Sequence, residues 1–166
     1  GINIDMEEDK VSLFNLVRPK DINILSAISD VNEDVKLYRF DKYGHGSTID
    51  KNFALDTKIP VLDEGLIRTK TLNEVLDSSI YKDKQIDILS IDTEGTDYKV
   101  LRSLDIVRYR PKIIIIEDHN RNINDVMMTE VFKHLSNYGY ILRSWSFYSL
   151  IFILPNSSIL KDREKK

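Results

Sequence analysis

Short apolar stretches alternate with amphipathic ones along most of the chain. Helical periodicity begins near Glu7, where Val11, Phe14 and Val17 share one face and Pro19 ends the helix. This alternation predicts an α/β domain built around a parallel sheet. Four stretches are rich in β-branched residues, as strands are: residues 2–4, 22–28, 86–92 and 113–116.

The same pattern predicts the later helices. Residues 71–74, Thr-Leu-Asn-Glu, form a capping box that opens a short helix. Another helix carries Val100 and Leu101, and a third covers residues 125–137, with Gly139 behind it as a C-terminal cap.

The remaining strands are expected near the edges of the sheet. Residues 35–40 alternate polar and apolar side chains, as an exposed or edge strand does, and residues 61–70 hold a further short strand. Residues 140–145 and 150–154 have a short connection, which makes them an antiparallel pair. The four isoleucines at 113–116 are typical of a strand buried on both faces. We therefore expect a Rossmann-like, mostly parallel sheet with helices on both faces and a C-terminal antiparallel hairpin.

Composition narrows the class of protein. The chain has 166 residues, 42% of them hydrophobic, which suits one domain over residues 1–160 and a charged tail at 161–166. Its formal net charge of −3 argues against nucleic-acid binding. The sequence has no cysteine, and its apolar runs are too short to span a membrane. These features predict a cytoplasmic protein without a nucleic-acid or membrane partner.

Acidic side chains follow the apolar strands. Asp5, Asp92 and Glu117 each come at the end of a strand, and Ser29-Asp30 ends another. In an open parallel α/β sheet, ligands bind outside the carboxyl ends of the strands. We therefore expect these acids to form one rim, which is a physical argument for a binding site.

Each of these acids also has a purely structural interpretation. Asp5 either accepts hydrogen bonds from ribose hydroxyls or caps the following helix together with Glu8. Asp92 and Glu94 flank a tight turn at Gly95, and they either serve a site or cap the next helix.

The histidines differ in what they suggest. Glu117 and His119 are close enough in sequence to act as an acid–base pair, although a lone loop histidine is more often solvated. His134 lies near the polar face of a predicted helix and suggests no role. His45 lies between glycines in a loop over residues 43–48 that could act as a lid, and nothing else supports a role for it.

Several common motifs are absent from the sequence. No G-x-x-x-x-G-K-[ST], G-x-S-x-G or G-x-G-x-x-G occurs, which excludes P-loop enzymes and hydrolases with a nucleophile elbow. Metal-ligand spacing such as H-E-x-x-H is also missing, and we predict no metal site.

Residues 71–117 resemble the C-terminal half of FkbM-family methyltransferases. The resemblance rests on T-L-N-E-V-L-D, then I-D-I-L-S-I-D-T-E-G-T-D-Y-K-V-L-R-S-L, then P-K-I-I-I-I-E. The N-terminal G-I-N-I-D-M-E is similar to the second strand of the family, and N-I-L-S-A-I-S-D is similar to its third strand.

This resemblance implies an S-adenosylmethionine-dependent O-methyltransferase. The acceptor would be a hydroxyl of a sugar or secondary metabolite, as a small molecule or a glycan, and the protein could form a homo-oligomer. A base would remove the hydroxyl proton while the fold aligns the acceptor. The implied cofactor-binding residues are Asp5, Met6, Ser29, Asp30 and Asp92. The implied catalytic residues are Asp92, Glu94, Glu117 and His119.

One part of the family pattern is missing. The first strand of the family, with its glycine-bearing loop, would precede Gly1, so we expect this chain alone to bind S-adenosylmethionine poorly or not at all. Two alternatives stay open. The first is a nicotinamide-binding Rossmann enzyme, which Asp5 fits equally well, and the second is a degenerate or fragmentary domain without catalysis.

Overall fold

The structure, a computed structural model, describes residues 1–42, 45–120 and 122–155 and forms two compact units. The first unit comprises Gly1–Val75 and Glu94–Ser103. The second comprises Leu76–Thr93 and Leu104–Lys166. The tail predicted for residues 161–166 lies outside the described residues, as do Tyr43 and Gly44 of the predicted loop.

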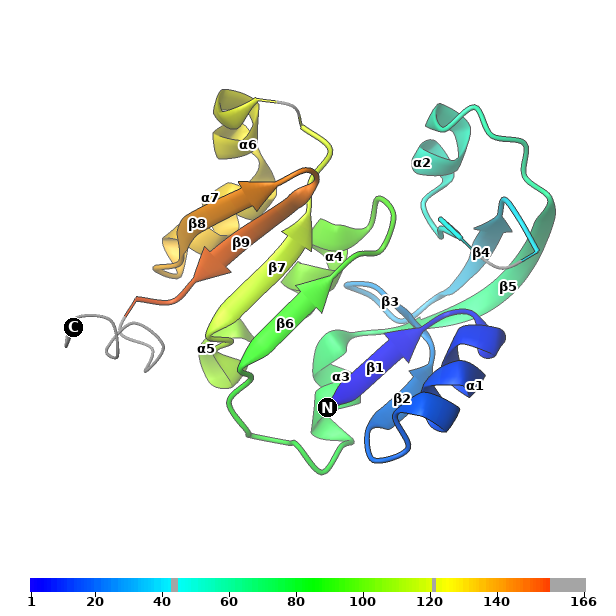
Figure 1. The fold of residues 1–166 in the computed structure, drawn as a ribbon, viewed down its shortest axis with the longest axis horizontal. Coiled ribbons are helices and arrows are strands. Elements are labelled where there is room, and N and C mark those ends of the chain that lie inside the picture. The colour runs from blue at the N-terminus through cyan, green and yellow to red at the C-terminus, as the bar shows by residue number, and fades with distance from the viewer. Residues whose placement is uncertain (43–44, 121, 156–166) are drawn as a thin grey trace. The chain divides into compact units, whose positions relative to one another are not determined.

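The first unit holds two small sheets (Figure 1). One pairs β1 with β2 in parallel, and in the other β5 lies between β3, which is parallel to it, and β4, which is antiparallel. Helix α3 begins in this unit and ends in the second. The elements are β1 (Ile2–Asp5), α1 (Glu8–Val17), β2 (Ile22–Leu25), β3 (Ala27–Ile28), β4 (Asp34–Arg39), α2 (Lys51–Asp56), β5 (Asp63–Lys70), α3 (Leu72–Asp77) and α4 (Asp97–Arg102).

The second unit is built on a four-stranded sheet in the order β6-β7-β9-β8 (Figure 1). Strands β6 and β7 are parallel, and β9 is antiparallel to both β7 and β8, which confirms the predicted C-terminal antiparallel pair. The elements are β6 (Ile88–Ile91), α5 (Ile106–Tyr109), β7 (Ile113–Glu117), α6 (Ile123–Met128), α7 (Glu130–Asn137), β8 (Ile141–Ser146) and β9 (Ser149–Ile153).

The α/β class is confirmed, but the prediction of one sheet is wrong for the described residues. Residues 22–28 form two strands that belong to different sheets, because Ser26 makes the last backbone bond to Asp5 and the chain then pairs with β5. Strand β6, expected inside the sheet, is an edge strand of its own sheet because it pairs with β7 alone in the described part of the chain.

The isoleucine run of β7 is buried on one face of its sheet rather than on both. Ile114 and Ile116 are fully buried, together with Leu150 and Phe152, which lie opposite them on β9. The alternate residues of β7 are only half-buried, as the two-residue period of a strand allows. Helix α7 covers the buried face through Phe132, whose ring lies 6.1 Å from that of Phe152.

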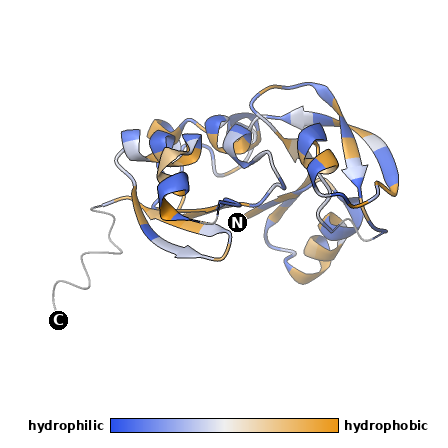
Figure 2. Cartoon of the chain, turned by 90° about the horizontal axis from the view of Figure 1, so that it is seen from above, coloured by the Kyte–Doolittle hydropathy of each residue, from blue (hydrophilic) through white to orange (hydrophobic). Residues whose placement is uncertain are grey.

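The helices carry both hydrophilic and hydrophobic residues, as amphipathic helices do (Figure 2). The helix predicted over residues 125–137 is interrupted at Thr129, whose extended backbone ends α6 and whose Oγ1 accepts a hydrogen bond from the N–H of Phe132 in α7. Gly139 has a φ of 82°, in the region that favours glycine after a helix, as predicted. No helix in the described ranges is long and apolar enough to cross a membrane.

Tyr140 ties the C-terminal strand pair to the start of β7. Its hydroxyl donates a hydrogen bond of 2.6 Å to the carbonyl of Pro111, and burial raises the pKa of Tyr140 to about 12. The folded state therefore holds this proton more tightly than the unfolded state. The protonated Tyr140 hydroxyl therefore contributes to the free energy of unfolding. This contribution is fully present below the ordinary pKa of 10.0 and is lost as pH rises toward about 12.

Tyr140→Phe should lower the free energy of unfolding by about 1–2 kcal/mol at neutral pH, because the Pro111 carbonyl loses its buried donor. Above pH 10 the variant should lose less stability than the wild type as the pH rises. It should still lose some, because burial also raises the pKa of Tyr109 to about 12 and Tyr109 is present in both proteins. Urea denaturation across this pH range measures both effects, and Tyr138→Phe, at an exposed tyrosine, is the control. If the wild type and Tyr140→Phe lost the same free energy of unfolding above pH 10, the loss could not be attributed to Tyr140.

Candidate functional site

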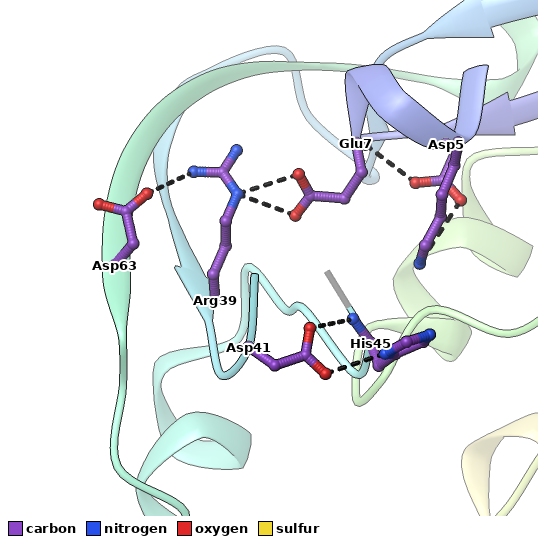
Figure 3. Close-up of polar contacts among 7 residues, drawn as sticks. Asp5, Glu7, Arg39, Asp41, His45 and Asp63 are labelled. Carbon is purple, nitrogen blue, oxygen red and sulfur yellow. Dashed lines mark hydrogen bonds and ion pairs between the residues drawn. The ribbon is translucent and has the colours of Figure 1, made fainter. Parts of the chain in front are cut away.

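The turn between β1 and α1 is organised by Asp5. Its Oδ1 accepts a hydrogen bond of 2.9 Å from the N–H of Glu7, which closes a local turn, and its Oδ2 lies 3.9 Å from Nζ of Lys10 (Figure 3). Helix α1 has Glu7 at its N-cap, without a side-chain capping bond. Asp5 is therefore not the helix cap, and the predicted box with Glu8 does not form.

A guanidinium links this turn to the antiparallel pair of β4 and β5. Nε of Arg39 donates to both carboxylate oxygens of Glu7, each at 2.9 Å, and its Nη1 donates to Asp63 at 3.0 Å (Figure 3). The hydrogen bond from Arg39 to Glu7 is the largest of the effects that raise the pKa of Arg39. We call these three residues, Glu7, Arg39 and Asp63, the Arg39 bridge.

Gly65 makes room for the Arg39 bridge. A Cβ atom at this position of β5 would lie 3.1 Å from Nη1 of Arg39. Glycine within a strand costs stability, and it often marks a place where another group approaches the backbone closely. The close approach here is that of the guanidinium.

The Arg39 bridge lies at an open pocket of about 800 Å³. The pocket has apolar and charged walls from the β1–α1 turn, the end of β2 and the antiparallel pair of β4 and β5. Met6, predicted to bind cofactor, is one of its lining residues. The other lining residues include Glu7, Leu25, Leu37, Arg39 and Leu66.

His45 has a partner that the sequence interpretation did not assign. Its Nδ1 lies 2.9 Å from Oδ2 of Asp41, and its backbone N–H donates to the other oxygen at 3.2 Å (Figure 3). A carboxylate that orients an imidazole is the arrangement of many general bases. The i,i+4 spacing of Asp41 and His45 was visible in the sequence and gave the signal that could have found the pair.

Asp30 is engaged in an ion pair within the first unit. Arg102 donates to Oδ2 of Asp30, and the hydroxyl of Ser29 donates to Oδ1 at 3.2 Å. The predicted pair of polar residues after β3 is therefore held in one place by α4, which carries Arg102.

The turn after β6 has a strained backbone at Glu94. Glu94 has a φ of 51° and Gly95 a φ of 100°, so both residues lie in the region that favours glycine. The hydroxyl of Thr48 donates to the Glu94 carbonyl at 2.7 Å. The N-cap of α4 is Thr96, which means that Glu94 does not cap this helix. Backbone strain of this kind gathers at functional sites, and it persists only where neighbours hold it.

The second unit brings Glu117 and His119 together at the carboxyl end of β7. Nε2 of His119 lies 3.3 Å from Oε2 of Glu117, and its ring lies 5.0 Å from that of Tyr148. The Glu117 side chain is 15% exposed and that of His119 is 51% exposed, so the carboxylate is sheltered while the imidazole reaches solvent. Asp92 follows the parallel neighbour β6, whose Ile91 lies opposite Ile116.

The predicted site residues therefore fall into two sets. Asp92, Glu117 and His119 belong to the second unit, and the last two are in contact. Sequence reasoning missed Glu7 and Arg39, which are separated by 32 residues and have no local pattern in common. The first unit holds Asp5, Met6, Ser29, Asp30 and Glu94.

One family model matches most of the chain. The family model described as the Methyltransferase FkbM domain matches residues 1–142. Comparisons with curated proteins and with solved structures gave no match.

Gly95→Ala should strongly destabilise the turn after β6. A Cβ at this residue would lie 2.9 Å from Phe53 of α2, and alanine is strained at this φ. We expect a loss of roughly 2–5 kcal/mol in the free energy of unfolding, from about 1–2 kcal/mol of backbone strain and about 1–3 kcal/mol of overpacking. Chemical denaturation of the single variant measures this loss. In a Phe53→Ala background the loss should be smaller but should still exceed the backbone part, because the clash with the ring is removed while the Cβ of residue 53, also at 2.9 Å, remains. An equal loss in both backgrounds would show that the Phe53 ring is not the obstacle.

Proposed function

Because the chain belongs to the FkbM family of methyltransferase domains, we propose that it transfers a methyl group from S-adenosylmethionine to a hydroxyl of a sugar or secondary metabolite. The family match over residues 1–142 is the observation that carries this proposal. The acceptor would be a free small molecule or a glycan.

The residues at the end of β1 fit the ribose of this cofactor. Asp5 is the last residue of β1, which is paired in parallel with β2, and it lies at the end of the sheet where nucleotides bind. One oxygen of Asp5 is used by the N–H of Glu7, and the other, 3.9 Å from Lys10 and partly exposed, is able to accept a hydrogen bond from a ribose hydroxyl. The chemistry of an ionised carboxylate suits this task because it accepts only.

When bound, S-adenosylmethionine supplies a strongly electrophilic methyl group, so the chain itself has to align the acceptor and manage one proton. Glu117 is the better candidate for the base in the second unit, because its carboxylate is sheltered and lies beside an imidazole. The acceptor hydroxyl would give its proton to this carboxylate as its oxygen bonds to the methyl group, while the sulfur–methyl bond breaks and S-adenosylhomocysteine leaves. His119 would orient Glu117 and exchange the proton with solvent, since its ring is half exposed.

Asp5→Ala in the native gene product should weaken binding of S-adenosylhomocysteine by about 1.5–3 kcal/mol, as expected for a lost hydrogen bond to a charged group. Asp5→Asn separates the two roles of the residue. It keeps an acceptor for the Glu7 N–H but removes the charge, and it should still lose part of the affinity. Calorimetry measures both variants, with Asp34→Ala on β4 as control.

Two outcomes of this titration would count against the assignment. Full affinity in Asp5→Asn and Asp5→Ala would mean that Asp5 only forms the turn. Thermal stabilisation of the wild type by NAD, without any by S-adenosylhomocysteine, would favour a nicotinamide-binding enzyme instead.

Glu117→Gln should lower turnover by about 10²-fold if Glu117 is the base, because the amide cannot take the proton. The affinity for S-adenosylhomocysteine should change little in this variant. Methyl transfer under single-turnover conditions is the measurement, and Glu64→Gln, on an exposed acid of β5, is the control. Wild-type turnover in both Glu117→Gln and His119→Gln would contradict this role and would mean that the protein contributes to catalysis only by aligning the acceptor.

A further inference from the structure

We propose that Arg39 is a positioning residue of the cofactor site, which acts on Asp5 through Glu7. This inference rests on the proposed function, because it assigns to Asp5 the ribose hydroxyls. Arg39 itself need not touch the cofactor.

Glu7 is held at two points that link Arg39 to Asp5. Its backbone N–H donates to Asp5 Oδ1 at 2.9 Å, and its side chain accepts from Arg39 Nε on both oxygens (Figure 3). Because both contacts belong to one residue, the guanidinium that fixes the Glu7 side chain also limits where its peptide N–H can point. The orientation of that N–H in turn limits the rotation of the Asp5 carboxylate.

The Arg39 end of this chain of contacts is firmly anchored. Arg39 is the last residue of β4, whose six residues pair in register with β5 from Asp34↔Arg68 to Arg39↔Asp63. Glu7, by contrast, lies in a turn between a strand and a helix. The pair of β4 and β5 therefore acts as the fixed support and the turn as the part that is supported.

Glu7 depends on Arg39 more than Asp63 does, because the Glu7 side chain is shielded from solvent. The Glu7 side chain is 12% exposed and that of Asp63 is 63% exposed, so the guanidinium meets one shielded carboxylate and one solvated carboxylate. Removing the cation leaves the shielded carboxylate without its charge partner, and such a group tends to move toward water. Movement of Glu7 would release Asp5 from the turn.

Arg39→Met should therefore weaken binding of S-adenosylhomocysteine about tenfold in the native gene product, somewhat less than Asp5→Ala does, because Arg39 acts on the cofactor only through Asp5. Arg39→Lys keeps the charge and should lose less. Lys36→Met is the matched control, because it removes another cation from β4. Lys36 forms an ion pair with Glu64 at 2.7 Å and does not contact the β1–α1 turn through this pair. It should leave the affinity unchanged.

The Asp5→Ala background distinguishes positioning from general destabilisation. If Arg39 acts through Asp5, Arg39→Met should cost no further affinity once Asp5 is replaced by alanine, although it should still lower the melting temperature. Amide hydrogen exchange gives a readout without cofactor, in which the Glu7 N–H should exchange faster in Arg39→Met than in the wild type.

The outcomes separate this inference from the proposed function. Equal losses of affinity from Arg39→Met in the wild-type and Asp5→Ala backgrounds would overturn the positioning role, as would unchanged exchange at Glu7. Absence of S-adenosylhomocysteine binding by the wild type would instead overturn the proposed function, while faster exchange at Glu7 would still establish the link from Arg39 to the turn.

Discussion

Parallel hydrogen bonding between neighbouring strands is the constraint on which both sets of polar side chains depend. In the first unit, β1 and β2 pair in register up to Asp5↔Leu25, so the chain leaves both strands at one end of the sheet. In the second, the pairing of β6 with β7 brings Asp92 and Glu117 to the same end. Apolar residues form the paired strands, and polar residues follow where the strands stop, which is where parallel α/β sheets bind ligands.

Within the Arg39 bridge, the two carboxylates do not contribute equally. Exposed ion pairs are worth about 0–1 kcal/mol, because water screens them and two flexible side chains must be ordered. The contact with Asp63 is of this kind, whereas Glu7 is sheltered and is bound through both oxygens. The pair of Arg39 with Glu7 should therefore dominate the placement of the guanidinium, and Asp63 should mainly hold its far side.

The sequence predicted most elements but not their grouping into sheets. Periodicity is a local property, which explains why α1, β4, β7 and the β8–β9 pair appear close to where they were expected. Pairing is not local, and nothing near Ser26 indicates that the strand would divide there between two partners. Helix α2 was missed, although Asp50 caps it with bonds from the N–H groups of Asn52 and Phe53. The candidate site shows the same division, because Asp5 and Glu117 end strands and His119 comes two residues after β7, whereas the contacts of Arg39 and Thr48 join residues 32 and 46 positions apart.

Strand β4 has a role that its edge position does not suggest. It carries Arg39, and its Tyr38 exchanges two backbone hydrogen bonds with Thr48, at 2.8 and 3.0 Å. Thr48 is fully buried, and its hydroxyl donates to the carbonyl of Glu94 in the strained turn. One strand therefore supports both the turn at Asp5 and the turn at Glu94 in the first unit. The left-handed backbone of Glu94 persists only where neighbours hold it, and β4 contributes to this through Tyr38 and Thr48, whereas it reaches the turn at Asp5 through Arg39.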